Sequence, residues 1–233
     1  MIMQQQRMVV VGAINVDISG TASTAMRAGD SNPGHVKVTL GGVGRNIAEN
    51  LARLGAKVTM LTVLGEDPNA AHVRQECAIA GIDLTYARTV PGGRTSTYLC
   101  LNDADGEIYA AVSDMEICNA ITPEYLESCR DVLSTADLVV VDANIPEDSI
   151  HYLATHCSCP LVADPVSVKK AGKLKACLGS FVTLKPNRPE AALLTGVEIE
   201  GLRGLEQAGR ILLSKGVKRV FISLGAQGVY YTD

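Results

Sequence analysis

Short apolar runs alternate with segments of helical periodicity along most of this 233-residue chain, and this alternation constrains the fold most strongly. The first run is Arg7-Met-Val-Val-Val-Gly12, and apolar residues at helical spacing follow at 43–54. Uniformly apolar runs of this length are typical of strands buried on both faces, and strands separated by helices form parallel sheets. We expect further strands at 57–64, 137–142, 160–163, 181–185 and 218–223, with helices at 68–80, 122–134, 147–155, 188–195 and 203–215. The pattern predicts a single α/β domain over residues 1–233.

Two stretches interrupt this alternation. Residues 15–40 are rich in Gly, Ser, Asn and Pro and end in an alternating strand. Residues 85–112 contain three short strand-like segments, at 85–90, 95–101 and 107–112, joined by turns at 91–93 and 102–106. Turns of this composition between alternating segments indicate antiparallel hairpins. We predict that about 15–40 and 92–114 form a small β lid over a ligand cleft, and that its open strand edges pair with a second copy to give a homodimer.

Charge and composition exclude several kinds of partner. The net charge is −4 and aromatic residues make up 4% with no Trp, so neither a basic field nor a stacking surface favours a nucleic acid polymer. No apolar run approaches the length that spans a bilayer, and the amino terminus lacks the apolar stretch of a signal peptide. We therefore expect no membrane association and a cytoplasmic protein. Cys157-Ser-Cys159 lacks the spacing of a zinc or redox site.

Two polar motifs lie in the first third of the chain. Asn15 and Asp17 follow the first strand and point to the same side of an extended segment, where they can hold neighbouring hydroxyls of a polyol. A turn in which both side chains bond their own backbone is an equally good interpretation. Gly41-Gly-Val-Gly44-Arg-Asn46 opens a helix and lets backbone approach a ligand, or it forms a tight strand-to-helix turn. Its spacing matches neither a dinucleotide fingerprint nor a Walker A loop.

Two further motifs lie late in the chain. Asn187 and Glu190 have the spacing of a capping box, which is the preferred local interpretation. The alternative is that both face a triphosphate through Mg²⁺, which prefers oxygen ligands and retains water. Ser223-Leu-Gly225-Ala-Gln-Gly228 ends an apolar strand in a hydroxyl and two glycines, which suits phosphate oxygens or a simple hairpin turn.

The order of these four motifs resembles the ribokinase (PfkB-type) carbohydrate kinase family, from about residue 7 to residue 233. The resemblance implies a mostly parallel central sheet flanked by helices, with a small β lid, and a phosphotransferase acting on an alcohol group. It implies ATP and Mg²⁺ as cofactors, with a monovalent cation as a further candidate. It assigns the acceptor to Asn15, Asp17, Gly42, Asn46 and Asn144, the nucleotide to Lys185, Asn187, Ser223, Gly225 and Gly228, and the metal to Glu190 through water and to Asp164.

Within that family the resemblance is strongest to the pseudouridine kinases. It is carried by residues 28–34, 41–47, 113–115, 119–122 and 164–167. It implies a small-molecule acceptor, a nucleoside phosphorylated at its 5′-hydroxyl, with pseudouridine as the first candidate. A sugar kinase acting on a free sugar such as ribose is the alternative, because the family shares the hydroxyl-binding motifs.

One family motif has no counterpart within the 233 residues. This is the Gly-Ala-Gly-Asp segment whose Asp is the family's catalytic base; Ala28-Gly-Asp30 has similar letters but precedes a Pro-Gly turn. The resemblance implies that the base lies beyond Asp233 and that the 233-residue chain alone is inactive. A non-catalytic nucleoside- or sugar-binding remnant is therefore a further alternative. A dehydrogenase-like nucleotide binder is opposed by the missing G-x-G-x-x-G.

Overall fold

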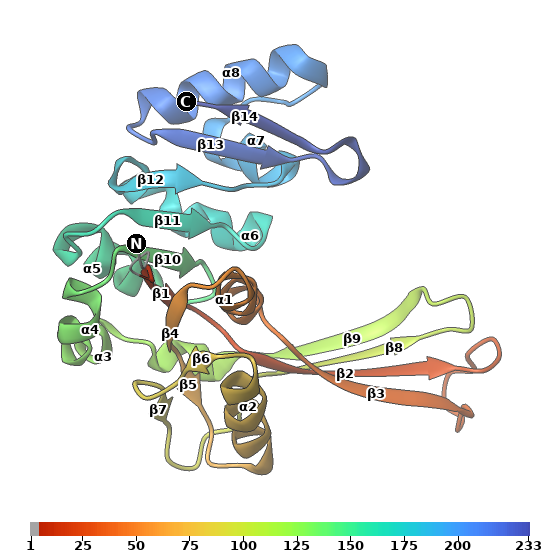
Figure 1. The fold of residues 1–233 in the computed structure, drawn as a ribbon. Helices are drawn as coiled ribbons and strands as arrows, with labels where there is room; N and C mark the ends of the chain where they lie inside the picture. The colour runs from red at the N-terminus through yellow and green to blue at the C-terminus, as the bar shows by residue number, and fades with distance from the viewer. Residues whose placement is uncertain (1–4) are drawn as a thin grey trace.

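A central eight-stranded sheet organises the computed structural model, which describes residues 5–233 (Figure 1). The strand order is β14-β13-β12-β11-β10-β1-β4-β6, and all neighbours pair in parallel except β13 and β14. The strands are β1 (Arg7–Val11), β4 (Lys57–Leu61), β6 (Ile82–Asp83), β10 (Leu138–Asp142), β11 (Leu161–Asp164), β12 (Phe181–Leu184), β13 (Arg219–Ser223) and β14 (Val229–Thr232). The predicted mostly parallel sheet is confirmed.

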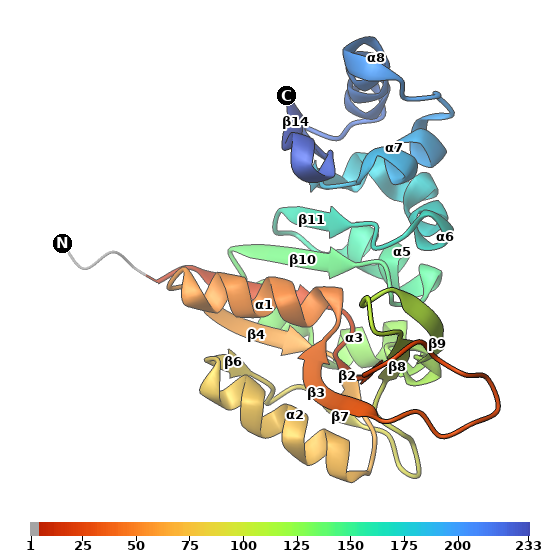
Figure 2. The same cartoon turned by 90° about the vertical axis from the view of Figure 1, so that its right-hand side faces the viewer.

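Helices cover both faces of the sheet around β1, β4 and β10, which explains why the inner positions of β1 and β10 are apolar. Val9 and Val11 of β1 belong to one core cluster, whereas Val10 between them belongs to the other. Successive side chains of a strand point to opposite faces, so burial on both faces requires an unbroken apolar run. Figure 2 shows α1 and α2 on one side of the sheet and α3, α5, α7 and α8 on the other.

The helices begin and end close to the predicted positions. They are α1 (Val43–Arg53), α2 (Pro68–Ile79), α3 (Pro123–Ser128), α4 (Arg130–Ser134), α5 (Glu147–His156), α6 (Val168–Ala171), α7 (Arg188–Thr195) and α8 (Gly201–Ser214), with 3₁₀ helices η1 (Glu116–Ala120), η2 (Gly172–Ser180) and η3 (Gly225–Gln227). Within residues 5–233 no helix is both long and apolar enough to cross a membrane.

A second, four-stranded sheet projects from the edge at which the parallel strands end (Figure 1). It consists, in order, of β3 (Gly34–Gly41), β2 (Asn15–Ala22), β8 (Thr97–Asn102) and β9 (Ile108–Asp114). The hairpins β2–β3 and β8–β9 are antiparallel, and the parallel pair β2–β8 joins them. The register gives this sheet one polar face, with Asp17 between Thr39 and Tyr98, and one apolar face, with Ile18 between Val38 and Leu99.

Two predictions of local structure need correction, and one stretch was missed. Residues 85–90 do not join the antiparallel sheet, because β7 (Arg88–Thr89) pairs in parallel with β5 (Val63–Leu64) in a small sheet of its own. The helix predicted at 122–134 is divided at Cys129, whose backbone (φ −100°, ψ 12°) separates α3 from α4. The stretch α6–η2 was not predicted, because one α-turn followed by 3₁₀ geometry carries no 3.6-residue periodicity.

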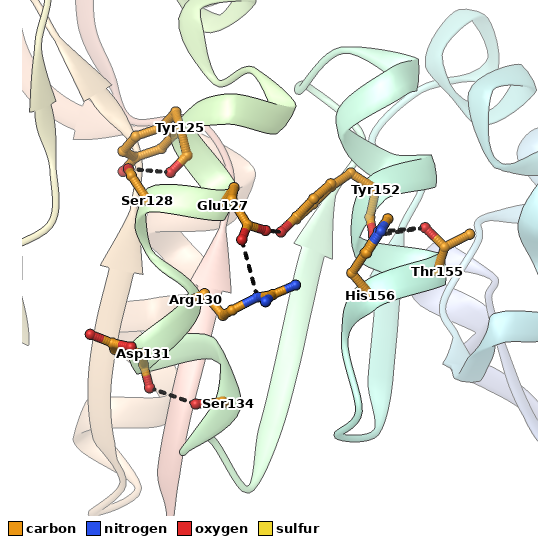
Figure 3. A network of polar contacts seen from close by, with 9 residues as sticks. All are labelled: Tyr125, Glu127, Ser128, Arg130, Asp131, Ser134, Tyr152, Thr155 and His156. Atoms are coloured by element: carbon orange, nitrogen blue, oxygen red, sulfur yellow. Dashed lines mark hydrogen bonds and ion pairs between the residues drawn. The ribbon is translucent and has the colours of Figure 1, made fainter.

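A polar network braces α3 and α4 against α5 (Figure 3). The Tyr152 hydroxyl donates to Glu127, Arg130 Nε lies 3.3 Å from the same carboxylate, and the Tyr152 ring stacks on His156 at 4.5 Å. Because α5 begins after the carboxyl end of β10 and runs back toward the amino end of β11, its last turn lies near the amino ends of the strands. The network therefore supports the helical layer at a distance from the ligand edge.

Candidate active site

The predicted site residues follow neighbouring parallel strands and gather along one edge of the central sheet. Strands β1, β10, β11, β12 and β13 are consecutive in the sheet, and parallel strands present their carboxyl ends at the same edge. Along this edge come Asn15 and Asp17 after β1, Asn144 after β10, Asp164 at the end of β11, Lys185 and Asn187 after β12, and Ser223 at the end of β13. The order runs from the predicted acceptor residues to the predicted nucleotide residues.

Asp142, the last residue of β10, ties three segments of this edge together. Its carboxylate is fully buried; Oδ2 accepts from Ala13 N (3.1 Å) and Gly44 N (2.7 Å), and Oδ1 accepts from Asn144 N (2.6 Å). Burial raises the pKa of Asp142, and the N–H donors oppose that shift. One side chain thus positions the segment after β1, the start of α1 and the turn after β10.

Asn15 and Asp17 each present a buried oxygen that nothing else in the described chain satisfies. Both residues lie in the extended strand β2 on the same face, so the alternative of a local turn is wrong. The Oδ1 atoms of both side chains are buried and have no hydrogen-bond partner among residues 5–233. Burial raises the pKa of Asp17, and the positive charge of Arg45 lowers it. Buried acceptors without donors are costly, so this pair is suited to receive two hydroxyl groups from a ligand.

The glycine motif brings α1 close to the buried oxygens of Asn15 and Asp17. Gly42, the N-cap of α1, has φ 94°, and a Cβ there would lie 2.5 Å from the Ala13 carbonyl oxygen. A Cβ on Gly41 would lie 2.0 Å from Asp17 Oδ2. The motif is therefore a tight strand-to-helix turn, as one of the two interpretations held. Asn46 is exposed in the first turn of the helix that this turn places beside Asp17.

On the nucleotide side, Asn187 and Glu190 form the predicted capping box. Asn187 Oδ1 accepts from Glu190 N at 2.9 Å, while Asn187 N and Nδ2 donate to the two Glu190 carboxylate oxygens, each at 2.8 Å. Burial raises the pKa of Glu190, and the bond from Asn187 N lowers it. The local interpretation is confirmed, and a water-mediated metal contact would use the lone pairs that the cap leaves.

Asp164 supplies the other carboxylate predicted for a metal. Its Oδ2 lies 3.2 Å from Lys185 Nζ, and its Oδ1 accepts from Val166 N at 2.9 Å. Val166 has φ 68°, an uncommon backbone conformation for a β-branched residue, of the kind that clusters at active sites and ligand clamps. The negative charge of Asp164 contributes to the raised pKa of Glu190, after burial. Within residues 5–233 no three His, Cys, Asp or Glu side chains cluster as metal ligands. The carboxylate oxygens of Asp164 and Glu190 are of the kind that Mg²⁺ prefers, and Mg²⁺ commonly takes its remaining ligands from water and phosphate oxygens.

Ser223 lies beside Asn187, because the two residues form a parallel bridge and Ser223 N donates to the Pro186 carbonyl at 2.9 Å. Gly225 and Gly228 lie in the turn of the antiparallel β13–β14 hairpin, which Leu224 N closes onto the Gly228 carbonyl at 2.9 Å. The hairpin interpretation is therefore correct for the backbone, and the turn is next to the capped start of α7.

Sequence reasoning missed Asp142 and two lysines. Lys170 of α6 donates to Asn144 Oδ1, and Lys173 Nζ donates to the carbonyls of Ala143 (3.2 Å) and Ile145 (2.8 Å). Burial lowers the pKa of Lys173, and the neighbouring charge of Lys170 lowers it further. One feature of the sequence could have identified Asp142, namely a charged residue at the end of an apolar run. No feature of the sequence could have identified the two lysines, because clustered lysines usually lie on a solvated surface.

Comparisons with known proteins found a matching family, similar sequences and similar folds. The family described as pfkB family carbohydrate kinase matches residues 5–233. The pseudouridine kinase of Escherichia coli (strain K12) is 37% identical over 231 residues, which cover 99% of this chain and 74% of that protein. The solved structure of a carbohydrate kinase from Agrobacterium tumefaciens matches with a TM-score of 0.82 at 31% identity, covering 94% of this chain and 70% of that one. The structure of Arabidopsis thaliana ribokinase complexed with ribose and ATP matches with a TM-score of 0.83 at 24% identity, covering 98% and 75%, and shows likeness of fold.

Proposed function

Because this chain belongs to the pfkB family of carbohydrate kinases, we propose that it acts in the ATP-dependent phosphorylation of a nucleoside at its 5′-hydroxyl, with pseudouridine as the first acceptor. The observation that carries this proposal is the pair of buried oxygens of Asn15 and Asp17, which have no hydrogen-bond partner in the part of the chain that the structure describes. Two such hydrogen-bond-accepting oxygens side by side suit the adjacent hydroxyls of a ribose ring. The 37% identity to a pseudouridine kinase supports a nucleoside acceptor over a free sugar.

We place the nucleotide on the β12–β13 half of the edge. Lys185, Asn187 and Ser223 lie together there with the turn that contains Gly225 and Gly228. Mg²⁺ supplies charge neutralisation at the transferred phosphoryl group, and Asp164 with Glu190 would hold it largely through water. The ribokinase of similar fold was solved with ATP, which supports the choice of nucleotide.

The four-stranded sheet is proposed to be the lid. Its polar face, with Asp17 beside Thr39 and Tyr98, would cover the acceptor. Two carboxylates near the proposed acceptor site already have other roles. Asp17 would accept from hydroxyls of the substrate, and Asp142 accepts from backbone N–H groups. The role that these residues support is therefore binding and positioning.

A panel of acceptors tests the function. The protein that carries this sequence is expected to phosphorylate pseudouridine with a higher kcat/KM than uridine or ribose, measured as ADP release with MgATP. Equal or better turnover of ribose would contradict the nucleoside assignment.

The apolar face of the lid is proposed to pair with a second copy of this chain. Val36, Val38 and Val112 are 73%, 52% and 65% exposed, and the register places them on one face with Leu99 and Leu101. A contiguous exposed apolar face of this kind usually marks an interaction site. Two like faces can pack on each other as sheets do, with the symmetry of a closed dimer.

Val112→Asp is expected to convert the dimer to monomer, because each buried carboxylate at the interface would lack a partner. Sedimentation analysis of wild type and variant across a concentration series measures this. Ala111→Asp is the matched control, since residue 111 is also exposed on β9 but faces the polar side. A monomeric wild type, or loss of the dimer in both variants, would refute pairing through this face.

A further inference from the structure

Lys170 is the one cationic side chain that the short helix α6 directs to the acceptor end of the site. Ser167 caps α6, which begins just after the Asp164–Val166 turn. Figure 1 shows α6 at the end of β11, on the side from which the second sheet projects. Lys170 is half-buried, whereas Lys169 beside it is exposed. Of these two adjacent lysines, Lys170 therefore packs against the fold and Lys169 lies in solvent.

The contacts of Lys170 leave part of its donor capacity open. Its Nζ donates to Asn144 Oδ1 and lies 4.0 Å from Met115 Sδ, a weak acceptor. An ammonium group has three N–H donors and no acceptor, so one strong partner does not satisfy it. Lys173 differs, because its Nζ is held by the carbonyls of Ala143 and Ile145 and thereby supports the turn after β10. Of these two lysines, Lys170 is thus the one available to a ligand.

The position of Lys170 connects it to the hydroxyl-binding residues. Its partner Asn144 is bonded through its backbone N–H to Asp142, which also holds Ala13, two residues before Asn15. The site therefore presents two complementary chemistries: buried oxygens that accept from hydroxyls, and an ammonium that only donates. A free sugar offers mainly hydroxyls, whereas a pyrimidine nucleoside also offers carbonyl oxygens, which only accept.

We propose that Lys170, aligned by Asn144, is a specificity residue that binds a carbonyl oxygen of a pyrimidine base and so favours nucleosides over free sugars. This proposal rests on the proposed function. A Lys170 that instead served the transferred phosphoryl group would act on all acceptors alike, so the two roles are separable by comparing acceptors.

Equilibrium binding of pseudouridine, uridine and ribose, measured by calorimetry without nucleotide, tests the proposal. Lys170→Met keeps the aliphatic stem and removes the charge. Its Kd for both nucleosides is expected to rise about tenfold or more, as for the loss of a charged hydrogen bond, while its Kd for ribose changes less than about twofold. Lys169→Met is the matched control and is expected to bind like wild type. Lys170→Arg should recover part of the nucleoside affinity.

Each other outcome decides the question. Equal weakening of ribose and nucleosides, or unchanged affinity for all three, overturns the role of Lys170. Unchanged acceptor affinity with a higher Kd for ATP assigns the lysine to the phosphoryl group. The wild-type values test the function separately: a wild type that binds ribose but neither nucleoside refutes the nucleoside function itself, and the base-binding role with it.

Discussion

Asp17→Asn is expected to raise the Kd of the acceptor about ten- to hundredfold and to change ATP affinity by less than about twofold. The carboxylate is half-buried, and its Oδ1 has no protein partner within residues 5–233, so ligand hydroxyls would be its main donors. A hydrogen bond to a charged group contributes about 1.5–3 kcal/mol, and each 1.4 kcal/mol corresponds to about tenfold in Kd. Calorimetric titration with acceptor and, separately, with ATP measures both effects.

The same variant predicts a change in pH dependence. Burial raises the pKa of Asp17, so the side chain protonates at a higher pH than an ordinary aspartate as pH falls. Wild-type acceptor affinity should therefore be complete above this raised pKa and decline as pH falls through it, whereas Asp17→Asn should lack that acid limb. Asp114→Asn, on the opposite face of the same sheet, is the control and should retain the decline at low pH.

An Asp17→Asn variant that loses ATP affinity alone would mean that the acceptor pocket has been misplaced.

Asp142→Asn is expected to destabilise the fold by about 2–4 kcal/mol and to weaken acceptor binding as well. The wild-type carboxylate accepts three backbone N–H bonds, and an amide would turn a donor toward at least one of them. A buried donor left unsatisfied costs about 1–3 kcal/mol, and the opposed donors add to this. Urea unfolding monitored by circular dichroism gives the stability, and titration of the folded variant gives the acceptor Kd.

Asp137, the residue just before the same strand, provides the matched control. It lies just before β10, is exposed, and accepts a single bond from Arg7 N at 2.7 Å. Asp137→Asn should cost less than about 1 kcal/mol and leave acceptor binding unchanged. Equal effects of the two substitutions would show that Asp142 does not organise the site. Lost stability with unchanged acceptor affinity would limit its role to the fold.

Much of the architecture was predictable because each buried strand leaves a local record. Residues 8–11 and 138–141 are apolar at every position, as burial on both faces of a sheet requires. The Asn187–Glu190 box was likewise predictable, since its partners are three residues apart. By contrast, β7 was misassigned, because a two-residue strand has too little pattern to select its partner.

The sequence by itself determined most of the strands and helices of the central sheet, and which polar residues follow the strands. Only the tertiary structure decided what those polar residues contact. Asp142 bonds Ala13 and Gly44 across separations of 129 and 98 residues, and Lys170 reaches Asn144 across 26. Such pairs depend on which strands become neighbours in the sheet, and no local periodicity encodes that choice. Asn15 and Asp17 could therefore be predicted from the sequence as hydroxyl-binding residues. Asp142, which positions them, and Lys170 could be recognised only from the fold.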